Sequence, residues 1–166
     1  MLREIDIVGR SSEEVLKALS DELGRLLPRP SDSRFLAMAK QIPLGLRAMA
    51  VTYYLDVSLA LDDLGWHFGN YHSKRLAKET AWGLEELGAA ELAHLFRKAF
   101  QLARKYWREL GRKNWDTWYG ESALSKSLDA LNGRAWEILR GKEYRIMGYW
   151  VDYARRYPER LGISET

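Results

Sequence analysis

The sequence contains no cysteine, so disulfide bonds, thiolate zinc sites and a cysteine nucleophile are all excluded. Long hydrophobic runs are also missing, and no stretch approaches the roughly 18 apolar residues that a membrane helix requires. The first nine residues carry Glu4 and Asp6 and lack a long apolar run, which is not the pattern of a signal peptide. From these absences we expect a cytoplasmic bacterial protein that does not contact a membrane.

Strand signals are almost absent as well, since residues 5–8 form the only β-leaning segment. There is no internal repeat, low-complexity tract or Gly/Ser linker, and helical periodicity dominates the rest of the chain. A length of 166 residues suits one domain. The sequence therefore predicts an all-α fold, a single-domain helical bundle of six to seven helices over residues 1–166, with residues 1–10 as an N-terminal arm.

Local signals set the expected helix boundaries. Ser11 followed by Glu14 has the form of a capping box, so a first helix is expected to begin there and to stop at Pro28. A central helix is expected after Pro43, closed by Gly65 and Gly69-Asn70, with the apolar stripe Leu46, Met49, Ala50, Tyr53, Val57, Ala60, Leu61 and Leu64. The other expected elements are short helical residues 33–41, helices over residues 73–88, 89–110 and 122–139, an aromatic connector at residues 114–120, and a final helix ending at Tyr157-Pro158.

Catalytic motifs are missing from the sequence. No Gly-x-Ser-x-Gly elbow, no Ser-x-x-Lys motif in a fitting context and no glycine-rich phosphate loop is present, so we expect neither an enzyme nor a bound cofactor. One cluster could hold a metal or perform acid/base chemistry: His67 and His72, near Asp62, Asp63 and Glu79. The two histidines are five residues apart, which does not place both on one helical face, and a helix end with solvated acids is the favoured interpretation.

The charge is unevenly distributed. Residues 97–113 hold seven basic side chains against one acid, a net charge of +6, while the remaining 19 basic and 22 acidic residues give −3. On one continuous helix, neighbouring tryptophans could offer stacking surfaces beside a polar face opposite the apolar stripe, and the residues that share this face are Arg97, Gln101, Arg104, Lys105, Arg108 and Arg112. The candidate binding patch is Arg97, Lys98, Arg104, Lys105, Arg108, Arg112 and Lys113 with Trp107, Trp115 and Trp118.

Two plainer explanations of this patch stay open. The outer face of an amphipathic helix must be polar, and acids such as Glu121 or Asp129 could neutralise it. Trp115, Trp118 and Tyr119 fall at helical spacing, which is also typical of side chains that close the end of a bundle.

Four stretches of the chain resemble a known family. Residues 55–70 correspond to a helix that ends in a glycine turn followed by aromatics and an asparagine, with a single Gly65 where the family has a Gly-Gly pair. A Leu-Gly-Ala step follows at residues 87–89, a Leu-Asp-x-Leu segment at 128–131, and a Tyr-rich, Arg-containing helix that ends at a proline at 149–159. Over about residues 45–160 the chain resembles a bacterial helical domain family of unknown function that includes a double-stranded DNA-mimic protein.

The resemblance implies an all-helical fold, no known catalysis and binding to another protein. DNA mimicry does not transfer, because a mimic presents an acidic surface whereas this chain has a basic stripe. The leading hypothesis is a non-enzymatic protein that binds another macromolecule, with an acidic protein surface as the expected partner. The alternative is direct nucleic-acid binding through residues 97–113. A third hypothesis is a small-ligand or metal-binding enzyme with a pocket near Trp66, His67 and His72.

Overall fold

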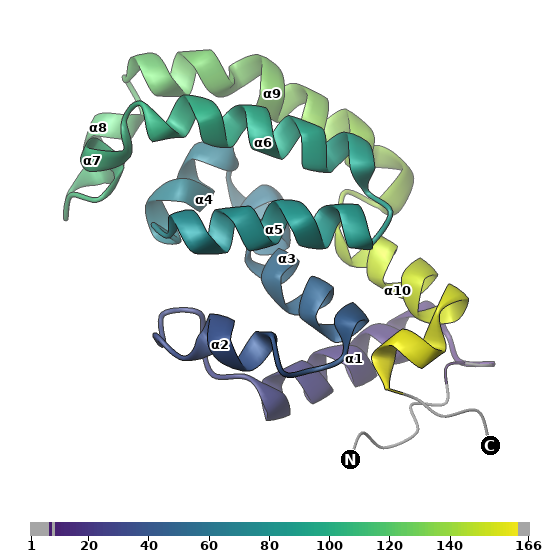
Figure 1. Ribbon diagram of the computed structural model, residues 1–166. Helices are drawn as coiled ribbons and strands as arrows, with labels where there is room; N and C mark the ends of the chain where they lie inside the picture. The colour runs from purple at the N-terminus through teal and green to yellow at the C-terminus, as the bar shows by residue number, and fades with distance from the viewer. Residues whose placement is uncertain (1–6, 8, 163–166) are drawn as a thin grey trace.

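A computed structural model describes Ile7 and residues 9–162, and most of the expected N-terminal arm and of the β-leaning segment lies outside the described residues. The described part contains helices and no strand, which confirms the predicted all-α fold (Figure 1). Seven of its ten α-helices are seven residues or longer. The α-helices are α1 (Ser12–Leu26), α2 (Phe35–Ala39), α3 (Leu44–Leu61), α4 (Leu64–Asn70), α5 (Lys74–Glu86), α6 (Ala90–Arg104), α7 (Trp107–Leu110), α8 (Trp115–Tyr119), α9 (Ala123–Leu139) and α10 (Met147–Arg156). Two 3-10 helices, η1 (Arg140–Lys142) and η2 (Pro158–Leu161), flank α10.

Helix α3 is the central helix, as predicted. In Figure 1, α9, α6 and α5 stack on one another, and α3 runs from beneath α5 towards α1 and α2. By length and composition α3 could cross a membrane, contrary to the expectation for this sequence, but 61% of that span is buried inside the molecule. The predicted apolar stripe was wrong at its end, because Ala60 and Leu61 are exposed whereas Leu55 and Leu59 are buried.

Two hydrophobic clusters contact different halves of α3, the first its C-terminal half and the second its N-terminal half. One joins α3 to α4, α5, α6 and α9 and includes the fully buried Phe68 and Phe96. The other joins α3 to α1, α2 and α10 around the fully buried Trp150. Burying aromatic side chains of this size contributes about 1.5–3 kcal/mol each in apolar transfer alone, so both clusters hold α3 in place.

Short polar side chains begin several helices where the sequence predicts. Ser11 Oγ accepts a hydrogen bond from Glu14 N at 3.2 Å, and the Glu14 carboxylate accepts one from Ser11 N at 2.8 Å. Ser73 caps α5 and Ser122 caps α9 in the same way, because each serine hydroxyl accepts a hydrogen bond from the backbone N–H three residues later. Each cap satisfies a backbone N–H that has no partner within the helix, which explains why these boundaries can be found locally.

The prediction that Gly65 and Gly69-Asn70 close the central helix was wrong, because α3 already ends at Leu61 and these glycines lie within the next helix, α4. Asp63 caps α4 by accepting a hydrogen bond from Trp66 N at 2.9 Å. A side chain at Gly65 would meet the Tyr119 ring at 2.0 Å, and one at Gly69 would meet Trp115 at 2.4 Å. These glycines therefore permit close packing against α8.

The predicted single helix over residues 89–110 is instead two helices. The N–H groups of Lys105 and Tyr106 bond to carbonyls only three residues back, which tightens the last turn of α6. Tyr106 then leaves the helical region, with φ −116° and ψ 22°, and α7 begins. The expected aromatic connector also contains a helical turn, α8.

Candidate functional site

The C-terminal end of α6, α7, α8 and the turns between them form one end of the molecule (Figure 1). Six basic side chains of these segments are exposed, and none makes an ion pair with any residue of the described chain. We call this surface the basic end, and its residues are Lys98, Arg104, Lys105, Arg108, Arg112 and Lys113.

The break at Tyr106 changes how the basic end is built. Lys98 lies in the middle of α6 and Lys105 is the residue that follows its last turn, but the expected continuous stripe stops there, because the helix breaks at Tyr106. Arg108 lies on α7, and Arg112 lies in the turn that leads to α8. The predicted cations are therefore carried by α6, by α7 and by the turn between α7 and α8, instead of by one helix face.

Arg97 does not belong to this free set. Its guanidinium lies 2.5 Å from the Glu85 carboxylate, an acid on the adjacent helix α5. This hydrogen bond raises the pKa of Arg97 and lowers the pKa of Glu85. The sequence also named Glu121 and Asp129 as acids that could neutralise the patch. Neither of them pairs with a cation of the basic end in the described structure.

The three tryptophans of the predicted patch pack against the molecule. The Trp107 ring stacks on His72, with ring centroids 4.3 Å apart, and the Trp107 carbonyl lies 2.7 Å from His72 Nε2. The ring centroids of Trp115 and Trp66 are 4.8 Å apart in a T-shaped arrangement, and those of Trp118 and Tyr106 are 5.9 Å apart. All three are partly buried against the cluster that contains Phe68, so they anchor α7 and α8 to the bundle.

The residues of the predicted metal or acid/base cluster do not form one site, because they make separate contacts within the protein. Glu79 pairs with Arg47 at 2.6 Å, and Asp63 accepts a hydrogen bond from the Tyr119 hydroxyl at 3.1 Å. No group of three His, Asp or Glu side chains within the described residues could hold a metal ion. Asp62 is exposed.

His67 is buried and not available to a ligand. Its Nδ1 lies 3.2 Å from Ser58 Oγ, whose hydroxyl donates to the Tyr54 carbonyl at 2.8 Å, so Nδ1–H is the donor in this pair. Burial lowers the pKa of His67 to about 4, against an ordinary value of 6.5. The imidazole is therefore neutral at physiological pH and serves the packing of α4 against α3.

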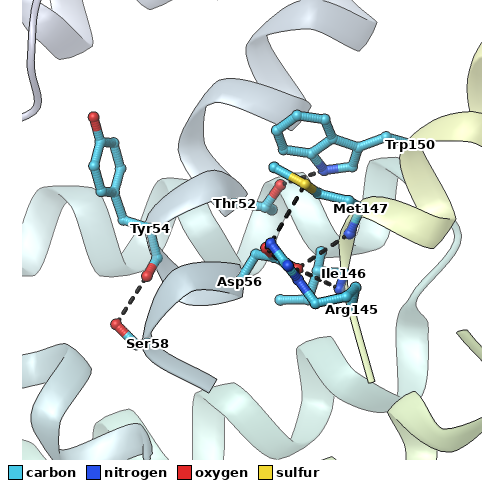
Figure 2. Close-up of polar contacts among 8 residues, drawn as sticks. All are labelled: Thr52, Tyr54, Asp56, Ser58, Arg145, Ile146, Met147 and Trp150. Atoms are coloured by element: carbon cyan, nitrogen blue, oxygen red, sulfur yellow. Dashed lines mark hydrogen bonds and ion pairs between the residues drawn. The ribbon is translucent and has the colours of Figure 1, made fainter. Parts of the chain in front are cut away.

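A buried carboxylate on α3 escaped the sequence reasoning. The Asp56 side chain is wholly buried and accepts hydrogen bonds from the Arg145 guanidinium and from the backbone N–H groups of Ile146, at 2.6 Å, and Met147, at 3.3 Å. Figure 2 shows these groups converging on Asp56 from the start of α10. One signal was present in the sequence: an acid inside the most apolar helix of the chain.

Asp56 fixes α10 against α3. The carboxylate satisfies N–H groups at the helix start that have no intrahelical partner, where negative charge is also favourable. One turn further along α10, the Trp150 indole donates to Thr52 Oγ1 at 3.2 Å (Figure 2). The hydrogen bond to Asp56 raises the pKa of Arg145. Because Asp56 has no exposed surface and all its partners lie within the chain, we interpret this junction as structural.

Comparison with protein families identifies a relationship for most of the chain. A family described as DMP19-like protein matches residues 40–157, a range that contains α3, the basic end and the Asp56 junction. No curated protein and no solved structure gives a significant match.

Proposed function

The chain belongs to the DMP19-like protein family, and we propose that it is a non-enzymatic binding protein that engages an acidic macromolecule through its basic end. The match confirms the resemblance to a helical family inferred over about residues 45–160. Family membership alone does not identify a partner. The proposal therefore depends on one observation, the six exposed cations that have no acidic partner in the described chain.

Exposed cations without ion pairs contribute little to the stability of the fold, so stability does not explain why they are there. An exposed ion pair contributes only about 0–1 kcal/mol, and unpaired cations close together repel one another. Arg104 and Lys105 gain a small benefit from their position at the C-terminus of α6, but Arg112 and Lys113 lie outside the helices. A surface that concentrates one sign of charge instead accelerates association with a partner of opposite sign and orients it.

The tryptophans favour a protein partner over single-stranded nucleic acid. Bases bind nonspecifically by stacking on exposed aromatic faces, but one face of Trp107 is covered by His72 and Trp115 is packed on Trp66 and Gly69. The faces of Trp107 and Trp115 are thus partly occupied by the protein's own side chains, which makes them poor stacking platforms. An acidic protein surface can bind to the basic end through its charge alone, without stacking on an aromatic ring.

Affinity capture from the native host tests the proposal. The bait is the full chain, compared with Arg104→Glu/Arg108→Glu and with the matched control Arg10→Glu/Arg140→Glu. The control makes the same charge change at two exposed cations that lack ion pairs and lie outside the basic end. We expect wild type and control to retain the same acidic protein and the Arg104/Arg108 variant to lose it by about tenfold or more. Equal capture by all three baits would overturn the proposal.

A second arm tests the nucleic-acid alternative, which the same cations also favour. Fluorescence anisotropy with a labelled 20-base-pair DNA duplex measures its affinity at 50 and 200 mM salt. Four phosphate contacts would weaken DNA binding about 10²-fold over this range, because counterions are released on binding. We expect no such binding. Tight DNA binding with this salt dependence, lost in Arg104→Glu/Arg108→Glu, would replace the acidic-protein proposal with the nucleic-acid one.

A further inference from the structure

A hollow separate from the basic end lies between α3, the segment after α1 and the turn between α4 and α5. It consists of two adjoining cavities of about 290 and 630 Å³, both lined by Arg29, Tyr53 and Tyr54. The smaller cavity is also lined by apolar side chains that include Leu27 and Phe35. The larger one is also lined by Tyr71 and His72. The smaller volume lies at the lower limit of the range of known small-molecule sites, and the larger one lies in the middle of that range.

Three phenol groups gather at this hollow. The ring centroids of Tyr53 and Tyr54 are 4.9 Å apart, and those of Tyr54 and Tyr71 are also 4.9 Å apart. Figure 2 shows the Tyr54 ring on the side of α3 away from Asp56, whereas the Tyr53 ring lies against Trp150, with ring centroids 6.2 Å apart.

The hydroxyls of these three partly buried tyrosines make no hydrogen bond within the described chain, whereas those of two buried tyrosines do. Tyr119 donates to Asp63 at 3.1 Å, and Tyr153 donates to Glu86 at 2.5 Å. Burial raises the pKa of Tyr54 to about 12 and also raises the pKa of Tyr71. Both remain neutral at physiological pH and can donate a hydrogen bond to a ligand.

The charge at the hollow is positive. Arg29 makes no ion pair with any described residue, and neither cavity is lined by an aspartate or a glutamate. His72 adds no negative charge to the hollow, and its Nε2 is within hydrogen-bond distance of the Trp107 carbonyl. A site with one free guanidinium, phenolic donors and apolar aromatic walls suits a ligand with a matching anionic group and a flat apolar body.

We propose that this hollow binds a small planar aromatic carboxylate. The carboxylate is held by Arg29 and the hydroxyls of Tyr54 and Tyr71, while the ring system lies against the aromatic and apolar walls near Phe35. The proposal requires both Arg29 and the tyrosine hydroxyls that lack a hydrogen-bond partner, because either feature alone is common on protein surfaces. The proposal does not depend on the partner of the basic end, since no cation of that end lines the hollow.

Isothermal titration calorimetry with 2-naphthoate and its neutral analogue 2-naphthamide tests the site on the full chain. Ligands of this size bind preformed pockets with a Kd of about 0.1–1 mM. We expect 2-naphthoate in that range and 2-naphthamide about tenfold weaker or undetectable, because only the carboxylate makes charge-assisted hydrogen bonds. Absence of naphthoate binding, or equal affinity for both compounds, would overturn the proposal.

Two variants locate the binding. Arg29→Gln is expected to raise the Kd for naphthoate about 10-fold or more and to abolish the preference over the amide, and Tyr54→Phe to raise it about 2- to 10-fold. Matched controls are Arg140→Gln and Tyr144→Phe, two exposed residues that line neither cavity, and both variants are expected to bind as wild type does. Far-ultraviolet circular dichroism confirms that each variant is folded. Unchanged binding by a folded Arg29→Gln would show that naphthoate binds elsewhere.

Discussion

The Asp56 junction and the basic end treat charge in opposite ways. At the junction, one buried carboxylate is surrounded by an arginine and two backbone N–H groups, and every partner comes from the chain itself. At the basic end, six cations extend into solvent without an acidic partner. A buried charge costs several kcal/mol unless it is paired, so the first arrangement is required by the fold. The second contributes little to the fold, which leaves it available for binding.

Replacing the buried carboxylate should have the largest effect. Asp56→Ala leaves the Arg145 guanidinium unpaired and the start of α10 without its acceptor, so we expect a loss of about 3–5 kcal/mol in the free energy of unfolding. Urea denaturation measures this loss. The matched control is Asp152→Ala, an exposed carboxylate paired with Lys142, for which less than about 1 kcal/mol is expected. Similar losses for both variants would remove the distinction between the two regions.

Acid pH should weaken the interior through His67. The unfolded chain binds a proton at this residue below about pH 6.5, whereas the folded chain does so only near pH 4. Stability from this source is therefore complete above pH 6.5 and is lost as the pH falls towards 4, by about 3 kcal/mol in total. We expect His67→Phe to lack this decline in urea denaturation between pH 6.5 and 4. An exposed control, His94→Gln, should keep it, and an unchanged slope in His67→Phe would contradict the assignment.

The packing beneath the basic end can be tested at Gly69. Its Cβ in Gly69→Ala would lie 2.4 Å from the Trp115 ring, so we expect a net loss of about 1–2 kcal/mol despite the better helix propensity of alanine. Gly133→Ala in α9 has open space around the new methyl group and should gain about 0.5–1 kcal/mol. Thermal denaturation distinguishes the two. A gain at both positions would mean that Trp115 does not anchor α8 to α4.

Charge reversal at the basic end should change stability least. Arg104→Glu/Arg108→Glu removes no ion pair in the described chain and costs only the small helix-terminus interaction of Arg104. We expect a change of less than about 1 kcal/mol in urea denaturation. A loss comparable with that of Asp56→Ala would show that these cations serve the fold.

Much of the fold could be predicted because its signals are local. Ser11, Ser73 and Ser122 announce helix starts through bonds that span three residues, and the apolar content of α3 identifies the central helix. The helix α4 was missed because glycines usually end helices. Here the reason for Gly65 and Gly69 lies in Tyr119 and Trp115, about 50 residues away in the sequence.

The candidate sites were less predictable because they depend on neighbours that no local pattern reveals. The charge of residues 97–113 was visible, but the pairing of Arg97 with Glu85 and the turn at Tyr106 were not. The hollow at Tyr54 requires α3, the segment after α1 and the turn before α5 to meet, and no local spacing predicts that meeting. His72 alone connects the predicted pocket to the observed hollow, since His67 is buried.

The salt dependence of partner binding tests the role of the basic end most directly. The measurement is the Kd of the captured acidic protein for the wild-type chain and for Arg104→Glu/Arg108→Glu between 50 and 500 mM NaCl. Salt screens exposed charges over about 10 Å at 0.1 M, so wild-type affinity should fall steeply over this range. The variant should bind at least tenfold more weakly at 50 mM and show a much flatter dependence. Equal affinities and equal salt slopes for the two proteins would contradict the account.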